Sequence, residues 1–146
     1  MRIIGGKLKG KKIFHVNNLT TRPLRDFVKE NVFNIIDHSK LIDIKIKNSS
    51  VLDLYSGIGS FGLECISREA NNVTFVEKDK NALMYLNKNI EELLIKKKIS
   101  IFTQDTSQFF KINKIKKYDI VFLDPPYAKR DYTEDLKILK KLNLMN

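Results

Sequence analysis

The sequence predicts an α/β domain built on a doubly wound parallel sheet with helices on both faces. Short apolar runs alternate with segments of helical periodicity, and they lie at Val51–Leu54, Val73–Val76, Ile99–Phe102 and Ile120–Leu123. Crossovers of this length join strands that run parallel. The length of 146 residues suits one domain over residues 1–146. Within it we expect an N-terminal ribbon and helix over residues 1–40 and a ligand-binding core over residues 50–146.

The N-terminal part is expected to hold a short ribbon and one helix. The segment "RIIGGKLKGKKIF" has two apolar runs around Gly-Gly and Lys-Gly turn signals, which predicts a small β ribbon with a basic face. A helix is predicted from Pro23 to about His38, because apolar residues recur there at helical spacing: Val28, Val32, Phe33, Ile35 and Ile36. The stretch "KLIDIKIKNSS" stays ambiguous, since its isoleucines alternate as in a strand while the flanking context suits a connector.

Two further helices follow from periodicity. Asp79 is a candidate N-cap for the helix between the second and third apolar runs, whose expected apolar stripe comprises Leu83, Leu86, Ile90, Leu93 and Leu94. After Tyr127 there remain 19 residues, enough for one helix that contains Leu136, Leu139 and Leu142. The single cysteine, Cys65, falls on the apolar side of a helix, which predicts a buried, inert thiol rather than a nucleophile.

The net charge of +10 favours a polyanionic partner, because a basic surface attracts phosphate. Biased base composition is a competing explanation, since 22 of the 27 basic residues are lysine. Local clustering is more informative: the first twelve residues hold no acid and five basic residues, namely Arg2, Lys7, Lys9, Lys11 and Lys12. Three arginines, Arg22, Arg25 and Arg130, stand out because the planar guanidinium reads phosphates and bases well.

Several classes of protein and site are not expected. No apolar run approaches the roughly 20 residues of a membrane span, and the N-terminus has no signal-peptide core, so a cytoplasmic location is expected. His15 and His38 are isolated, and no metal-ligand spacing occurs, so no metal is expected.

The stretch "VLDLYSGIGSFGLE" contains the G-x-G-x-x-G spacing as Gly57, Gly59 and Gly62. This turn from a parallel strand into a helix serves any nucleotide-like ligand. Glu77 lies twenty residues after Gly57, at the end of the second run, where a carboxylate can accept both hydroxyls of an adenosine ribose. That ribose is common to NAD and S-adenosylmethionine, so Glu77 indicates a nucleotide cofactor without naming it.

Asp53 discriminates between these cofactors. It lies four residues before Gly57, where a carboxylate repels a pyrophosphate but attracts the ammonium and sulfonium of S-adenosylmethionine. The charge therefore favours the methyl donor, although Asp53 could instead cap the following turn. On this interpretation Gly57 and Gly59 allow close approach of the backbone, and Gly62 serves packing of helix against strand.

The stretch "YDIVFLDPPYAKR" predicts chemistry at an amino group of a nucleobase. Such a group is a poor nucleophile, so a site must accept its hydrogen bonds, orient it and receive its proton. Asp124 and the carbonyl of Pro125 can act as acceptors, with Pro126 stiffening the loop. Tyr127 can stack on a flipped base, although Pro-Pro alone could merely end a strand and Tyr127 could be core.

Together these motifs resemble the class I amino-methyltransferases that act on nucleic-acid bases. With "MRIIGGKLKGKKI" and "TRPLRDFVKENVFNII" included, the ordered set is similar to the RsmD family, bacterial enzymes that methylate N2 of a guanine in 16S rRNA. The resemblance implies a Rossmann-like sheet and a cofactor-binding and catalytic core that holds S-adenosylmethionine. The cofactor residues it implies are Asp53, Tyr55, Ser56, Gly57, Gly59, Glu77, Lys78 and Asp105, and the catalytic residues are Asp124, Pro125, Pro126 and Tyr127. It further implies that residues 1–40 bind 16S rRNA of the small subunit or its precursor, and the RNA-binding set is Arg2, Lys7, Arg22, Pro23, Arg25 and Arg130.

The C-terminus departs from the family pattern, which normally adds further strands and a hairpin. We therefore expect the C-terminal strands to be missing and the edge beside the fourth strand to be uncovered unless something else covers it. A monomer is expected. Competing functions are a nucleic-acid adenine-N6 methyltransferase, because D-P-P-Y does not name the base, and a catalytically impaired RNA-binding or ribosome-assembly relative. A nicotinamide oxidoreductase is opposed by Asp53.

Overall fold

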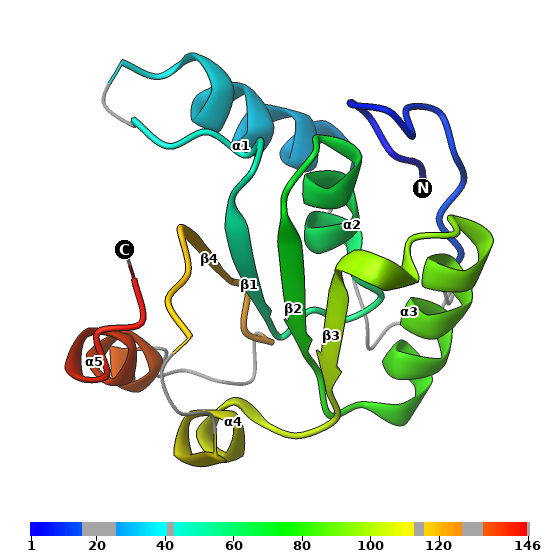
Figure 1. Cartoon of the computed structure of the whole chain (residues 1–146). Coiled ribbons are helices and arrows are strands. Elements are labelled where there is room, and N and C mark those ends of the chain that lie inside the picture. The colour runs from blue at the N-terminus through cyan, green and yellow to red at the C-terminus, as the bar shows by residue number, and fades with distance from the viewer. Residues whose placement is uncertain (16–25, 41–42, 113–115, 127–132, 146) are drawn as a thin grey trace.

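Four parallel strands form the central sheet in the order β3-β2-β1-β4 (Figure 1). The structure is a computed structural model that describes residues 1–15, 26–40, 43–112, 116–126 and 133–145. The strands are β1 (Ser50–Leu54), β2 (Asn72–Val76), β3 (Ile99–Phe102) and β4 (Ile120–Leu123). The chain order reverses between β1 and β4, which is where doubly wound sheets bind ligands at their carboxyl ends. The predicted Rossmann-like α/β fold is confirmed, and each predicted run is a strand.

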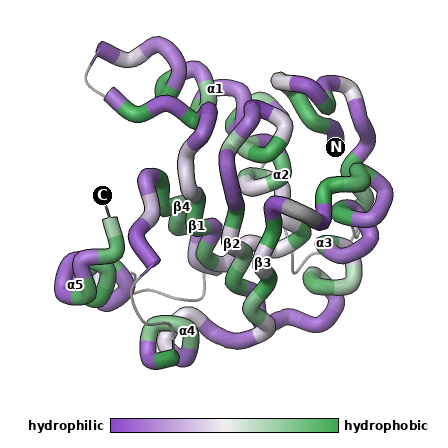
Figure 2. Tube along the Cα trace, in the orientation of Figure 1, coloured by the Kyte–Doolittle hydropathy of each residue, from purple (hydrophilic) through white to green (hydrophobic). Residues whose placement is uncertain are grey.

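Helices cover both faces of this sheet. They are α1 (Asp26–His38), α2 (Ser60–Ser67), α3 (Lys80–Glu92), a 3₁₀ turn η1 (Lys96–Lys98), α4 (Thr106–Ile112) and α5 (Thr133–Lys141). Side chains alternate along β1, so Val51 packs with α1, α2 and α3, whereas Leu52 and Leu54 pack with α4 and α5. In Figure 2 the helical coils alternate between hydrophobic and hydrophilic segments, as expected for helices with one buried face. None of the described helices is long and apolar enough to span a membrane.

Helix α2 lies unusually close to β2 because of Gly62. A Cβ atom at this position would lie 2.4 Å from Phe75 Cε1 and 2.8 Å from Val73 Cγ1. A side chain there would displace the Phe75 and Val73 side chains of β2, so the expected packing role of Gly62 is confirmed. Cys65 on the same helix is buried, and burial raises the pKa of its thiol well above the ordinary range, as expected for an inert cysteine.

Helix α3 begins as predicted and ends earlier than predicted. The Asp79 carboxylate accepts a hydrogen bond from the Ala82 N–H at 2.8 Å, which is the expected N-cap. Four members of the predicted stripe are buried: Leu83, Leu86, Ile90 and Leu93. The fifth, Leu94, was predicted wrongly: it is 89% exposed, because the chain leaves the helix there with a left-handed φ of 56° that turns the side chain away from the core.

The N-terminal segment pairs with itself as a short antiparallel ribbon, as predicted. Arg2 and Lys12 form a bridge, and the Ile3 N–H donates to the Lys11 carbonyl at 2.9 Å. Glu64 of α2 then fixes the ribbon to the core, since its carboxylate accepts hydrogen bonds from the Ile4 and Gly5 N–H groups at 2.9 and 2.7 Å. The ambiguous stretch at residues 43–49 is a connector without a strand in its described part.

The edge beside β4 is partly occupied. Tyr118, just before β4, forms a parallel bridge with Met145, and the Tyr118 N–H donates to the Leu144 carbonyl at 2.8 Å. The expected C-terminal helix is present as α5, with Leu139 buried and Leu136 49% exposed. Beyond this bridge, no strand in the described ranges pairs with the outer edge of β4.

Candidate functional site

Glu77 joins the loops that follow β1 and β2 at the carboxyl end of the sheet. Its Oε2 accepts a hydrogen bond from the Gly57 N–H at 2.7 Å, and its Oε1 accepts from the N–H groups of Lys78 and Asp79, both at 2.8 Å. The Glu77 side chain is only partly buried. Each carboxylate oxygen can accept more than one hydrogen bond, so Glu77 keeps capacity for a ligand's hydroxyls.

The loop after β1 has the backbone of a ligand cradle. Tyr55, Gly57 and Gly59 have left-handed φ angles of 58°, 56° and 83°. A Cβ atom on Gly57 would meet nothing within 4 Å, so the space beside it is open, whereas one on Gly59 would lie 2.4 Å from Leu86 Cδ1. The Ser56 hydroxyl is buried and has no hydrogen-bond partner among the described residues. An unsatisfied buried hydroxyl beside an open glycine suits the polar end of a bound molecule.

Asp53 lies beneath this loop rather than in it. Its side chain is 1% exposed, and its Oδ2 accepts a hydrogen bond from the Gly62 N–H of α2 at 3.0 Å. Its neighbours in register on the two adjacent strands are Phe75 and Phe122, so apolar rings flank the carboxyl group. Burial, reinforced by the charges of Asp124 and Glu77, raises the pKa of Asp53 to about 8.

The position of Asp53 matches the capping alternative. The hydrogen bond to Gly62 reaches the first turn of α2, and a carboxylate at a helix N-terminus satisfies an otherwise free N–H. The Asp53 side chain cannot contact a ligand directly in this conformation, because almost none of it is exposed. Asp53 would instead attract a cation in the loop above it electrostatically, without direct contact.

Asp105 caps α4 at the end of β3. Its Oδ1 accepts hydrogen bonds from Ser107 Oγ at 2.8 Å and from the Gln108 N–H at 2.9 Å, and these bonds hold the pKa of Asp105 below its usual value. Next to it, the Gln104 side-chain nitrogen is buried without a hydrogen-bond partner in the described part of the chain. Sequence reasoning missed Gln104, whose only signal was its place beside a predicted site residue.

The D-P-P segment leaves the sheet directly after β4. Asp124 reaches the surface, yet the surrounding protein removes enough water to raise the pKa of its carboxyl group. Pro125 is partly buried and Pro126 is exposed. Because Asp124 and Glu77 both act on the pKa of Asp53, the three carboxyl groups share one electrostatic environment. Five predicted site residues lie outside the described residues: Tyr127, Arg22, Pro23, Arg25 and Arg130.

Comparison with known proteins decides the family. A family model described as "Conserved hypothetical protein 95" matches residues 1–146. A relative named "Ribosomal RNA small subunit methyltransferase D", from Buchnera aphidicola subsp. Baizongia pistaciae, is 35% identical over 98% of this chain and 69% of its own length. The chain belongs to the RsmD family.

Other members with that name give the same result. The Haemophilus influenzae protein is 36% identical over 87% of this RsmD-family chain and 64% of its own length, and the Escherichia coli protein is 31% identical over 96% and 67%. The chain thus spans about two thirds of the curated relatives it matches. A solved structure of a candidate methyltransferase from Escherichia coli is 28% identical, covers 100% of this chain and 75% of its own, and superposes with a TM-score of 0.83.

A network of buried polar side chains behind the loop after β1 was also missed by sequence reasoning. The Tyr55 hydroxyl lies 2.7 Å from Thr106 Oγ1 of α4 and donates to Asp135 Oδ2 of α5 at 2.8 Å. The Tyr55 side chain thus points toward α4 and α5, and its main chain remains to line the loop. "TEDLKILKK" reads as an ordinary amphipathic helix, so nothing in it signals that Asp135 is buried.

Two basic residues predicted to bind RNA are described. Arg2 is exposed on the ribbon. Lys7 is exposed as well, but its ammonium group lies 2.7 Å from Glu69 Oε1. Exposed pairs of this kind are weak, so Lys7 can exchange Glu69 for a phosphate at little cost.

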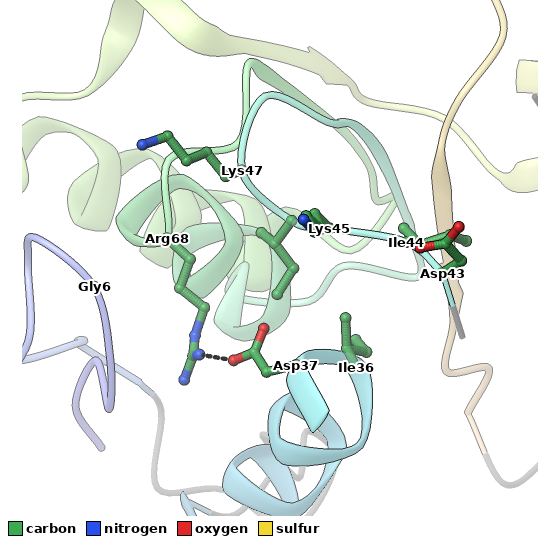
Figure 3. Close-up of a pocket in the computed structure, with 9 residues that line it drawn as sticks. Gly6, Ile36, Asp37, Asp43, Ile44, Lys45, Lys47 and Arg68 are labelled. Carbon is green, nitrogen blue, oxygen red and sulfur yellow. Dashed lines mark hydrogen bonds and ion pairs between the residues drawn. The ribbon is translucent and has the colours of Figure 1, made fainter. Parts of the chain in front are cut away.

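One hollow among the described residues lies away from the site. It has a volume of about 480 Å³ and is lined by the end of α1, the connector before β1, and Arg68 after α2 (Figure 3). These segments precede β1 and β2, so the hollow is at the amino ends of the strands. Its most prominent contact is an ion pair in which Arg68 Nη1 lies 2.6 Å from Asp37 Oδ2.

Proposed function

We propose that the chain transfers a methyl group from S-adenosylmethionine to the exocyclic N2 amine of a guanine in 16S rRNA of the small ribosomal subunit or its precursor. The observation that carries the proposal is the convergence of the glycine loop, Glu77 and the Asp124 segment at one end of the sheet. The relatives' names, which specify methylation of small-subunit rRNA, support it. The choice of guanine N2 rests on the resemblance of the motifs to the RsmD family. We expect the protein to be located in the cytoplasm.

The described residues fit S-adenosylmethionine. The orphan Ser56 hydroxyl and the open space beside Gly57 suit its methionine end, and Glu77 with the neighbouring Lys78 suits the ribose. Asp105, together with the Gln104 side-chain nitrogen, which has no hydrogen-bond partner among the described residues, suits the polar edge of an adenine. When bound, this cofactor supplies an electrophilic methyl group on a sulfonium.

Asp124 and Pro125 are proposed to hold the amino group of the substrate base. A carboxylate and a main-chain carbonyl are both acceptors, so together they fix the direction of the nitrogen lone pair. Because the pKa of Asp124 is raised, its carboxylate is also suited to accept the proton that the amine loses. Pro126 stiffens the segment, and Tyr127 would stack on the base, a contact worth about 1–3 kcal/mol.

The RNA is proposed to follow the basic ribbon toward the site. Arg2 and Lys7 would contact its phosphates, with Arg22, Pro23, Arg25 and Arg130 nearer the base. Lys12 and Lys88 both lie over the Phe14 ring, at 5.8 and 4.1 Å from its centroid, so positive charge from the ribbon and from α3 gathers at one place. Neither lysine forms an ion pair within the described ranges, which suits them to a polyanion.

A transfer assay tests the proposal. The purified chain is incubated with labelled S-adenosylmethionine and small subunits that lack the guanine mark, and the labelled nucleotide is mapped. We expect label on a guanine N2. Label on adenine would replace this proposal with the adenine-N6 alternative, and cofactor binding without transfer would favour the impaired RNA-binding alternative.

Asp124→Asn provides the matched test of the catalytic assignment. We expect it to lower the rate of transfer by about 10²–10⁴-fold, the usual contribution of a proton acceptor, while cofactor affinity stays near that of the wild type. Asp43→Asn removes an exposed carboxylate at the opposite end of the strands and serves as the control. An Asp124→Asn enzyme as active as the control would contradict the role of Asp124.

A further inference from the structure

Asp135 is a buried carboxylate that touches two of the loops at the carboxyl end of the sheet. It is 3% exposed in the first turn of α5. Its Oδ2 accepts a hydrogen bond from the Tyr55 hydroxyl at 2.8 Å, and its Oδ1 accepts one from Thr106 Oγ1 at 3.4 Å. The Tyr55 and Thr106 hydroxyls are themselves 2.7 Å apart, so the three side chains close a small network.

Two members of the network, Tyr55 and Thr106, stand next to residues proposed to bind the cofactor. Tyr55 immediately precedes Ser56 and Gly57, and Thr106 immediately follows Asp105. Asp135 lies on α5, the first described element after the D-P-P segment. The network therefore fastens the glycine loop, the start of α4 and the start of α5 to one another.

The backbone conformation of Tyr55 requires stabilisation by such contacts. Its φ of 58° is a left-handed conformation that residues other than glycine adopt uncommonly and at an energetic cost. The hydroxyl is the far end of that side chain, so its hydrogen bonds fix the ring and, through it, the backbone from which the loop departs. A buried carboxylate is costly unless it is satisfied, and the helix N-terminus together with the two hydroxyls satisfies this one.

We infer that Asp135 is a positioning residue for the cofactor site, which it orders through Tyr55 and Thr106 without touching the ligand. This inference rests on the proposed function. The neighbouring Glu134 provides a contrast, because its side chain is 62% exposed and pairs with Lys137 on the surface, at 3.2 Å. Among the described residues, this carboxylate one position earlier on the same helix contacts neither Tyr55 nor Thr106.

The test compares Asp135→Asn and Tyr55→Phe with Glu134→Gln as the matched control. Asparagine keeps the shape and removes the charge, and phenylalanine removes a single hydroxyl, so the second variant remains informative if the first folds poorly. Amide hydrogen exchange is followed at residues 56–59 and 104–106, with the β2 amides as an internal reference. We expect faster exchange in those two segments for both variants, with β2 unchanged and Glu134→Gln like the wild type.

The equilibrium affinity for S-adenosylmethionine is the second readout. We expect it to fall roughly tenfold in each single variant, and the double variant to lose little more, since the two residues act as one unit. Unchanged exchange in both segments, or losses of affinity that simply add, would overturn the inference. A wild-type chain that binds no S-adenosylmethionine would count against the proposed function, while the exchange comparison would still decide the role of Asp135.

Discussion

Two buried carboxylates of this chain have opposite electrostatic surroundings. Glu64 of α2 is fully buried and accepts two main-chain hydrogen bonds, and Arg68 Nε lies 3.2 Å and Lys29 Nζ 3.7 Å from its oxygens. Asp53 of β1 is equally buried, yet the structure gives it one main-chain hydrogen bond and no ion pair among the described residues. The nearby charges that act on Asp53 are those of other carboxylates.

This difference indicates a structural role for Glu64 and a functional role for Asp53. Glu64 ties the ribbon, α1 and α2 together, and its positive neighbours are themselves held: Lys29 Nζ donates to the Arg2 carbonyl at 2.7 Å, and Arg68 stacks over Phe33 at 4.6 Å. Asp53 ties down only the first turn of α2. A carboxyl group left without a counter-charge beneath an open loop is poised for a cation that arrives from outside.

The first expected effect is on stability at Glu64. Glu64→Gln leaves the fully buried Lys29 and the partly buried Arg68 beside a neutral side chain, which should lower the free energy of unfolding by about 3–5 kcal/mol. Urea denaturation at neutral pH measures it. Glu69→Gln, which disturbs only the exposed contacts to Lys7 and Lys47, should cost at most about 1 kcal/mol. Equal losses in the two variants would show that the buried cluster is no more structural than the surface pairs.

The sheet was predictable because its strands are short apolar runs flanked by helical periodicity. All four were found, with β1 and β2 each beginning one residue earlier than predicted, and the Asp79 cap and the tight packing at Gly62 followed from local rules. These features depend on residues close together in the chain. Leu94 was the exception, because the helix stops before the apolar pattern does.

The partners of buried polar groups were not predictable. Glu64 meets Ile4 across 60 residues, and Asp135 meets Tyr55 across 80, so no local pattern indicates either contact. Asp53 was predictable as a strand-end carboxylate, but its depth depends on which rings the neighbouring strands place beside it. The register between the strands determines which rings lie beside Asp53, and that register depends on the whole sheet.

The next effect is a pH dependence at Asp53. Its pKa of about 8 in the folded chain exceeds the value of about 3.9 expected when unfolded, so between these values the unfolded state holds fewer protons. The stability of the wild type should therefore fall as pH rises through this window, by at most about 1.4 kcal/mol per pH unit, and level off above it. Asp53→Asn removes this term, so its stability relative to the wild type should increase from acidic to alkaline pH. A constant difference across the window would mean that Asp53 is already ionised in the folded chain.

The smallest effect, and the one that tests the contrast most directly, is on ligand binding. A cation held in the loop favours ionised Asp53, so S-adenosylmethionine should bind the wild type with release of a proton below pH 8. Its affinity should then rise with pH, by at most about tenfold per unit, whereas Asp53→Asn should show little change. Calorimetry between about pH 5.5 and 6.5, below the titration of the ligand's own amino group, isolates this term, and buffers of different ionisation heat count the protons. The other titratable groups acting on Asp53, Asp124 and Glu77, are present in both proteins, so their contribution cancels in the comparison. If the two proteins released equal numbers of protons, Asp53 would be a structural carboxyl group like Glu64, and its place beneath the loop would serve only to cap α2.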